Sequence, residues 1–127
     1  MFPTELIWEA TKRNTCFLKK SNGFTLTREP FNLTNKHSLK YSGLAASKSI
    51  GMDLVENSNG KIVKKIVINK KNSGSSVIRC PKKFMGKVNV SNNVKCAKKT
   101  IKNQILSRKD LSVDAICKYK KLLKVRC

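Results

Sequence analysis

The sequence predicts an α+β fold: a short N-terminal helix, a small antiparallel sheet and two basic amphipathic C-terminal helices. Up to about residue 70, segments rich in β-branched residues are separated by turn signals that contain Asn and Gly. Beyond the Gly- and Ser-containing stretch at 69–76, apolar residues recur at helical spacing instead. The 127 residues show no internal repeat, and we expect one domain.

The N-terminal elements follow from capping and turn residues. We expect Thr4 to cap a short helix that Asn14 stops, with Trp8 packed into the core as its anchor. Ser-Asn-Gly at 21–23 tolerates positive φ angles and predicts the turn of a hairpin, which Pro30 ends because proline cannot extend a ladder. The segments expected to be extended are 15–20, 24–29, 38–41, 47–56 and 61–71, with a second hairpin turn at 57–60.

The C-terminal part predicts two basic amphipathic helices, the second of them capped by Asp110. The predicted organisation is a helix-and-sheet region over 1–71, a connector over 72–90 and basic helices over 91–127. The apolar stripes of the two helices comprise Val94, Ala97, Ile101 and Ile105, and then Leu111, Ala115, Ile116, Tyr119, Leu122 and Leu123.

Charge restricts the function more than any motif does. The chain has 28 Lys and Arg residues against 7 acidic ones, a formal net charge of +21 and a pI near 10.2. A compact domain with this excess repels itself and attracts a polyanion, so nucleic acid and anionic membrane are the candidate partners. Glu5 and Glu9 stand where a signal peptide needs a basic and then an apolar region, and no run approaches the ~20 apolar residues of a membrane span. We therefore expect an intracellular protein that binds nucleic acid.

Residues 32–51 contain no acidic side chain and hold the only histidine, His37, directly before Ser38. Neighbouring side chains on a strand point to opposite faces, so this pair makes a poor nucleophile and base. We expect no catalytic residue, and we expect His37 on the surface or stacked on RNA. A nucleic-acid-processing enzyme remains the alternative from another class.

The basic side chains are expected to bind RNA through phosphate contacts and counterion release. In 32–51 the small residues between lysines should let both backbone and lysines approach phosphates. The predicted RNA-binding residues are Lys12, Arg13, Lys20, Lys36, Lys40, Lys48, Lys82, Lys83, Lys87, Lys95, Lys98, Lys99, Lys102, Arg108, Lys109, Lys118 and Lys121.

The five cysteines have no C-x-x-C spacing, and we expect small buried thiols without zinc or cofactor. A metal held by distant cysteines and His37 is the alternative.

The sequence allows two roles for three of the aromatic residues, which either pack in the sheet or stack on unpaired bases. These residues are Phe17, Phe24 and Tyr41. We expect the N-terminal region to be the more stable part. The basic C-terminal helices should finish folding on RNA, because like charges crowd there.

Four segments, LIWEATKRNTCFLKK, REPFNL, SLKYSGL and KSIG, resemble in order and spacing the eukaryotic large-subunit ribosomal protein family numbered twenty-eight. The specific match covers residues 6–51; from 61 to 71 it is compositional, and from 91 to 123 it rests on two basic helices. The matching positions are Trp8, Arg13, Asn14, Phe17, Leu18, Lys20, Glu29, Pro30, Asn32, Leu33, Lys40, Tyr41, Gly43, Leu44, Lys48 and Gly51.

The resemblance implies an α+β structural constituent of the large subunit of the cytosolic ribosome. Its partners would be ribosomal RNA and neighbouring large-subunit proteins, in the cytoplasm after assembly in the nucleus or nucleolus, with no cofactor, membrane or small-molecule substrate. Ala46 and Ser47 stand where relatives tend to have basic or imidazole side chains, and 72–90 does not align. A ribosome assembly factor of the Mak-sixteen type, which shares the opening domain, is the runner-up.

Overall fold

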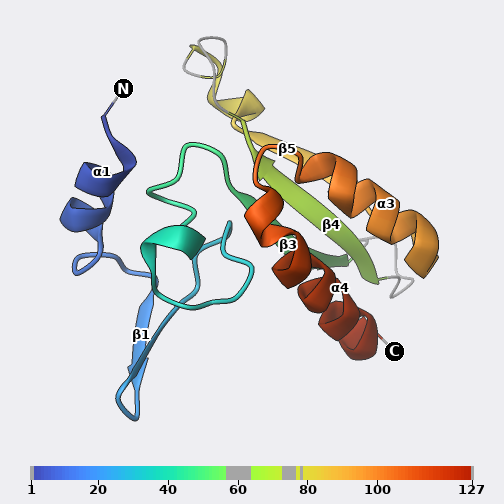
Figure 1. Ribbon diagram of the computed structural model, residues 1–127, viewed down its shortest axis with the longest axis horizontal. Coiled ribbons are helices and arrows are strands. Elements are labelled where there is room, and N and C mark those ends of the chain that lie inside the picture. The colour runs from blue at the N-terminus through green and yellow to red at the C-terminus, as the bar shows by residue number, and fades with distance from the viewer. Residues whose placement is uncertain (1, 57–63, 73–76, 78, 127) are drawn as a thin grey trace.

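The computed structural model confirms the predicted α+β class and describes residues 2–56, 64–72, 77 and 79–126. Its strands form two antiparallel sheets, a hairpin and a three-stranded sheet, and the two C-terminal helices lie beside the larger sheet (Figure 1). The predicted turn at 57–60 lies outside the described residues. The elements in chain order are α1 (Thr4–Thr11), β1 (Leu18–Ser21), β2 (Phe24–Thr27), η1 (Leu39–Tyr41), β3 (Ile50–Glu56), β4 (Lys64–Lys71), η2 (Pro81–Lys83), β5 (Met85–Asn89), α3 (Val94–Gln104), η3 (Lys109–Leu111) and α4 (Ser112–Arg126).

The first sheet is the predicted hairpin of β1 and β2. Asn22 and Gly23 have φ angles of 46° and 79°, and two consecutive positive φ angles give the tight turn that suits the right-handed twist of paired strands. Ser21 pairs with Phe24 directly across this turn. The hairpin projects from the rest of the molecule (Figure 1), and a side chain added at Gly23 would meet nothing within 4 Å.

The second sheet has the strand order β3-β4-β5, with both pairs antiparallel. Met52 pairs with Ile68 and Leu54 with Ile66, so these side chains share one face of the sheet. The sequence analysis predicted no strand in 72–90, where β5 completes the sheet. Its five residues alternate in burial, but the segment is short and has only Met85 and Val88 as large apolar residues, so no alternation stands out in the sequence.

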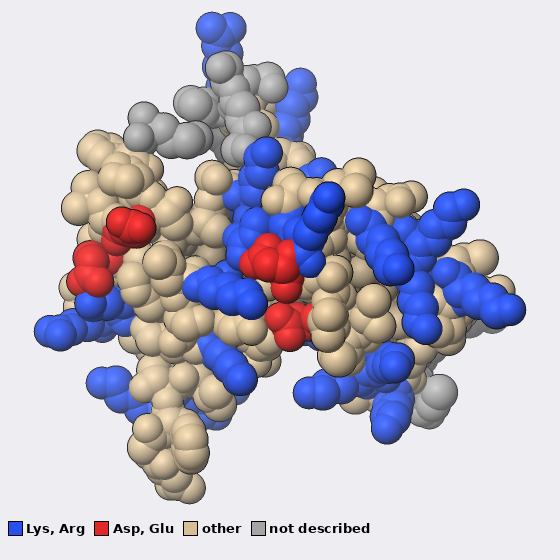
Figure 2. Space-filling view, viewed as in Figure 1, with Lys and Arg blue, Asp and Glu red and all other residues tan. Residues whose placement is uncertain are grey.

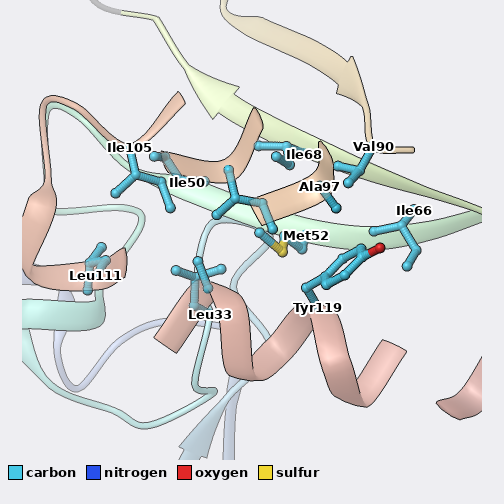
Figure 3. Close-up of a cluster of buried hydrophobic side chains, with 12 residues drawn as sticks. Leu33, Ile50, Met52, Ile66, Ile68, Val90, Ala97, Ile105, Leu111 and Tyr119 are labelled. Atoms are coloured by element: carbon cyan, nitrogen blue, oxygen red, sulfur yellow. The ribbon is translucent and has the colours of Figure 1, made fainter. Parts of the chain in front are cut away.

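The hydrophobic core lies between this face of the sheet and the helices α3 and α4. Met52 and Ile68 of the sheet, Ile101 of α3 and Tyr119 of α4 are completely buried. Figure 3 shows Met52, Ile68 and Tyr119 within this cluster. The Tyr119 hydroxyl donates a hydrogen bond to the Ser91 carbonyl oxygen at 3.1 Å. Burying one such apolar side chain contributes about 1.5–3 kcal/mol. The sheet thus provides the packing surface for both basic helices.

The apolar stripes predicted for the two helices account for this packing with one exception. Val94 is 41% exposed, whereas the other predicted positions of α3 are buried. The side chain of Asn93 caps α3 by accepting a hydrogen bond from the N–H of Lys95 at 3.0 Å. The core cluster is Leu33, Ile50, Met52, Ile66, Ile68, Val90, Ala97, Ile101, Ile105, Leu111, Ala115 and Tyr119, with Tyr41, Leu54, Val88, Ile116, Leu122 and Leu123 packed against it.

The N-terminal helix does not contribute to this core, and the expectation that Trp8 anchors it there is wrong. No residue of α1 is buried. Trp8 is half-buried and packs on the ring of His37, with ring centroids 4.8 Å apart, and His37 Nε2 donates to the Lys12 carbonyl oxygen at 2.9 Å. His37 is thus half-buried and attaches α1 to the rest of the molecule, contrary to the surface position that was expected.

Three local predictions are corrected by the structure. Pro3 occupies the N-cap of α1 and Thr4 is its first helical residue, without a capping hydrogen bond. The segment 38–41 contains the 3-10 turn η1 instead of a strand. Asp110 lies in η3 and pairs with Arg108, so it does not cap α4. Each correction concerns the end of an element or a short segment, where intrinsic propensity is only a weak guide.

Candidate nucleic-acid interface

Basic side chains dominate the surface. Figure 2 shows Lys and Arg groups spread over the sheet and the helices, whereas the acidic groups on this face gather at two places, one of them over α1. All but three of the predicted RNA-binding residues are exposed, the exceptions being the half-buried Lys12, Arg108 and Lys118. Within the described part of the chain, ion pairs join only Lys12 to Glu9 and Arg108 to Asp110. Most of the positive charge therefore faces outward without an acidic partner in this part of the chain.

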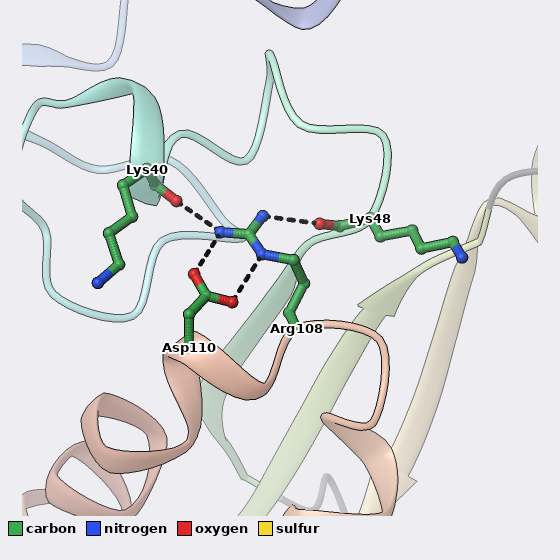
Figure 4. A network of polar contacts seen from close by, with 4 residues as sticks. All are labelled: Lys40, Lys48, Arg108 and Asp110. Carbon is green, nitrogen blue, oxygen red and sulfur yellow. Dashed lines mark hydrogen bonds and ion pairs between the residues drawn. The ribbon is translucent and has the colours of Figure 1, made fainter.

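Arg108 connects η1 and the segment before β3 to the C-terminal helices (Figure 4). Its Nη2 donates to the Lys40 carbonyl oxygen at 2.9 Å and its Nη1 to the Lys48 carbonyl oxygen at 3.3 Å. The same guanidinium holds both carboxylate oxygens of Asp110 at 3.1 Å, and these hydrogen bonds keep the pKa of Asp110 below its usual range. Arg108 therefore acts within the protein, where it positions the backbone that carries two exposed lysines.

A buried carboxylate, that of Glu29, holds the loop after η1 in place. Glu29 is 4% exposed. Its Oε2 accepts hydrogen bonds from Gly43 N at 2.7 Å, from Ser42 Oγ at 3.1 Å and from Leu44 N at 3.3 Å. Consecutive backbone N–H groups that converge on an anion form a phosphate-binding arrangement in many proteins, but here the glutamate occupies it. The N–H groups of Gly43 and Leu44 are consequently not available to phosphates, contrary to the expectation for 32–51.

Lys71 of β4 holds the same loop through its carbonyl groups. Its Nζ donates to the carbonyl oxygens of Ala46 at 2.9 Å, Gly43 at 3.2 Å and Leu44 at 3.3 Å. Burial lowers the pKa of Lys71, and the negative charge of Glu29 opposes part of this shift. The loop thus lies between a carboxylate that binds its N–H groups and an ammonium that binds its carbonyls. The sequence analysis did not single out Lys71, because nothing local distinguishes it from the other lysines of the strand.

Asn32 and Lys118 join the turn before η1 to α4. The Asn32 Oδ1 accepts hydrogen bonds from Asn35 N at 2.8 Å and Thr34 N at 3.0 Å. Lys118 Nζ donates to the Asn32 carbonyl oxygen at 3.1 Å. Burial lowers the pKa of Lys118, and the charge of Asp53 opposes this shift. Lys118, which was predicted to bind RNA, is thus engaged inside the protein.

Two glycines of the motif segments are required by close packing. A Cβ at Gly43 would lie 2.5 Å from the Phe31 Cβ, and a Cβ at Gly51 would overlap the Pro30 carbonyl oxygen. Together with the buried Glu29, they show what the motif between Glu29 and Gly51 does in the fold. It builds the scaffold that holds the exposed lysines of this region.

A groove of about 380 Å³ is lined by residues of β4, the C-terminal end of α3 and the segment before β3. Lys48, Lys70 and Lys71 line it together with the amide side chains of Asn103 and Gln104, and no acidic residue is among its described lining. Ammonium and amide donors around a concave surface suit the oxygens of a phosphodiester backbone. The sequence analysis missed Lys70, Asn103 and Gln104, since only the packing of α3 beside β4 brings them to Lys48. Leu106, Ser107 and Asn72 complete the lining.

The cysteines do not behave as predicted. Cys16, Cys80, Cys96 and Cys117 are free and exposed, so the expectation of buried thiols is wrong for these four. Cys127 lies outside the described residues. Among the residues with described positions, no group of three or more His, Cys, Asp or Glu side chains is arranged to hold a metal ion. In the same part of the chain, no helix has the length and apolar content needed to cross a membrane.

Comparisons with known proteins point to one family. The model of the Ribosomal L28e protein family matches residues 6–125. The large ribosomal subunit protein eL28 of Dictyostelium discoideum is 52% identical over 59 residues, which are 46% of this chain and 42% of that relative. The similarity therefore spans less than half the length of this curated relative, whereas the family match covers almost the whole chain.

Proposed function

We propose, because the chain belongs to the ribosomal L28e protein family, that it is a structural constituent of the large subunit of the cytosolic ribosome and supports translation by binding ribosomal RNA through phosphate contacts. Its partners are large-subunit ribosomal RNA and neighbouring large-subunit proteins, in cytoplasmic ribosomes that are assembled in the nucleus and nucleolus. The observation that carries the proposal is the family match over residues 6–125 in a chain of net charge +21.

The arrangement of the charges supports phosphate binding. A folded domain with net charge +21 is destabilised by self-repulsion, and a polyanion relieves this repulsion while releasing its own counterions. Lysines such as Lys40 and Lys48 are exposed, while Arg108 fixes the backbone to which they belong. Fixing the backbone in advance lowers the entropy cost of ordering this surface on RNA.

Within this surface, the groove beside Lys48 and Lys70 is our candidate for a preferred phosphate site. Lys71 in its lining donates to three carbonyl oxygens, so it adds positive charge to the groove while its ammonium is held within the protein. Lys48 and Lys70 are not in ion pairs with described residues. Their ammonium groups are therefore the ones that phosphate contacts would use.

Filter binding to deproteinised large-subunit ribosomal RNA tests the proposal. The logarithm of the binding constant of the full chain should fall linearly with the logarithm of salt concentration. Each phosphate-binding lysine removed should lower the slope by about one, so Lys48→Gln combined with Lys70→Gln should lower it by about two. Affinity that is flat between low and moderate salt would contradict phosphate-led binding.

A charge-matched control shows whether the groove matters. Lys120→Gln combined with Lys124→Gln removes two exposed charges from α4, outside the groove. A smaller loss of slope in this control supports the groove, and an equal loss means that the phosphates are spread over the whole surface. Co-sedimentation of the wild-type chain with large subunits through moderate salt tests the assembly itself.

A further inference from the structure

The hairpin of β1 and β2 presents an aromatic ring that the fold does not use. Of the three aromatic residues that the sequence left open, Phe17 is half-buried and Tyr41 packs against the core, whereas Phe24 is 74% exposed. Phe24 follows directly after the Asn22-Gly23 turn, at the end of the projecting hairpin (Figure 1). An aromatic ring held in solvent by a tight turn gains nothing from burial within the chain.

The register places this ring on a positively charged face. Residues directly opposite in an antiparallel pair share a face, and so do residues two apart on one strand. Lys19 pairs with Leu26, and Leu26 also bridges to Lys36, so one row of the face reads Lys19, Leu26, Lys36. Phe24 lies two residues before Leu26 and therefore on the same face. The Phe24 ring therefore lies next to Leu26 on this face, and Lys19 and Lys36 lie on either side of Leu26.

The composition of this face favours a nucleic acid over another protein as the partner of the hairpin. The 19 residues from Ala10 to Arg28 contain no acidic side chain, so the hairpin is complementary to a negatively charged partner. Its apolar area is limited to Phe24 and Leu26, which is small for an apolar contact with another protein. One ring beside lysines matches an unpaired nucleotide, whose base stacks on the aromatic face while its phosphates meet ammonium groups.

We propose that Phe24 is a stacking platform for an unpaired nucleobase of the bound RNA, with Lys19 and Lys36 on the adjacent phosphates. This inference rests on the proposed RNA-binding function and adds to it a base contact, whereas the groove contacts the phosphates. Because a base offers a flat π-face whatever its identity, the contact selects single-stranded over paired RNA and carries little sequence preference.

Substitutions of Phe24 that distinguish aromatic stacking from simple apolar contact test the proposal. Phe24→Ala should weaken binding of the full chain to deproteinised large-subunit ribosomal RNA by about 5- to 150-fold, as expected for one stacked base. Phe24→Tyr should retain affinity because it keeps the ring, and Phe24→Leu should lose nearly as much as Phe24→Ala. Since the side chain is exposed, all three variants should keep the wild-type melting temperature, and their salt slopes should be unchanged because no charge is altered.

A fully paired RNA duplex with the same number of phosphates is the matched probe. Phe24→Ala should leave affinity for the duplex unchanged. Equal affinity of Phe24→Ala and wild type for ribosomal RNA would overturn the stacking proposal while leaving the phosphate-binding function intact. Retained affinity in Phe24→Leu would also overturn it, since the contact would then be apolar and not aromatic. Failure of the wild-type chain to bind ribosomal RNA at all would instead refute the proposed function.

Discussion

Replacing Glu29 by glutamine tests the idea that a buried acid organises the basic surface. Glu29 Oε2 accepts three hydrogen bonds from the loop that Lys71 holds on its other side, and Oε1 accepts one from Thr27 Oγ1 at 3.2 Å. Glu29→Gln keeps the shape and one acceptor oxygen but removes the charge. The loop then lies beside the Lys71 ammonium without the negative charge of Glu29 that raises the pKa of Lys71 against the effect of burial.

The size of the effect follows from these bonds. A hydrogen bond to a charged group contributes about 1.5–3 kcal/mol and a neutral one about 0.5–1.5 kcal/mol. Each of the three bonds to Oε2 becomes a neutral hydrogen bond in Glu29→Gln, which costs roughly 1 kcal/mol per bond. The carboxylate no longer has to be desolvated, which offsets part of this loss. We expect Glu29→Gln to lower the free energy of unfolding by about 2 kcal/mol. Glu29→Ala, which leaves the three donors at Oε2 and the Thr27 hydroxyl without their acceptor, should lower it by about 4 kcal/mol.

Denaturant unfolding and thermal melting measure these changes. For a domain of this length, 1 kcal/mol shifts the melting temperature by about 3–5 °C. Glu9→Gln is the matched control, because it makes the same change in net charge at a side chain that is 63% exposed and pairs only with Lys12 among the described residues. An exposed pair contributes about 0.2–1 kcal/mol. If Glu29→Gln cost no more than Glu9→Gln, the reasoning about the buried carboxylate would be refuted.

Three further outcomes are expected. Gly43→Ala should lower the free energy of unfolding by about 2 kcal/mol, since its Cβ would lie 2.5 Å from the Phe31 Cβ; an unchanged melting temperature would contradict this. Because Arg108 holds the pKa of Asp110 below 3.8, the pair stabilises the fold above that pH and loses its contribution as the pH falls through the lowered pKa. Asp110→Asn should therefore show less acid sensitivity in denaturant unfolding at low pH. The pKa of Lys71 is lowered from 10.5, so between the two values the unfolded chain binds more protons and stability should rise with pH. Lys71→Met should lose that rise, and an identical pH profile in wild type and variant would exclude the effect.

Composition and short-range pattern were enough to predict several features of this protein. A net charge of +21 indicates a polyanionic partner without any knowledge of the fold. The Asn22-Gly23 turn was predictable because only a few residue types tolerate positive φ angles. The period of the apolar residues predicted both C-terminal helices, since a helix repeats its buried face within its own segment. The motifs between Trp8 and Gly51 indicated the family that the match over 6–125 confirms.

Which residues hold the architecture together depends on contacts that form only in the folded chain. Trp8 reads as a core anchor in sequence, yet the core forms where the sheet faces α3 and α4, because both helices pack their stripes on one continuous apolar face. Glu29, Lys71 and Arg108 look like ordinary charges in the chain. Each becomes structural only when folding brings backbone groups from distant segments within hydrogen-bond reach, and burial then makes those bonds costly to lose. The exposure of Phe24 also depends on the folded chain, because the core forms elsewhere and the hairpin projects from it. No pattern along the sequence distinguished Phe24 from a buried aromatic residue.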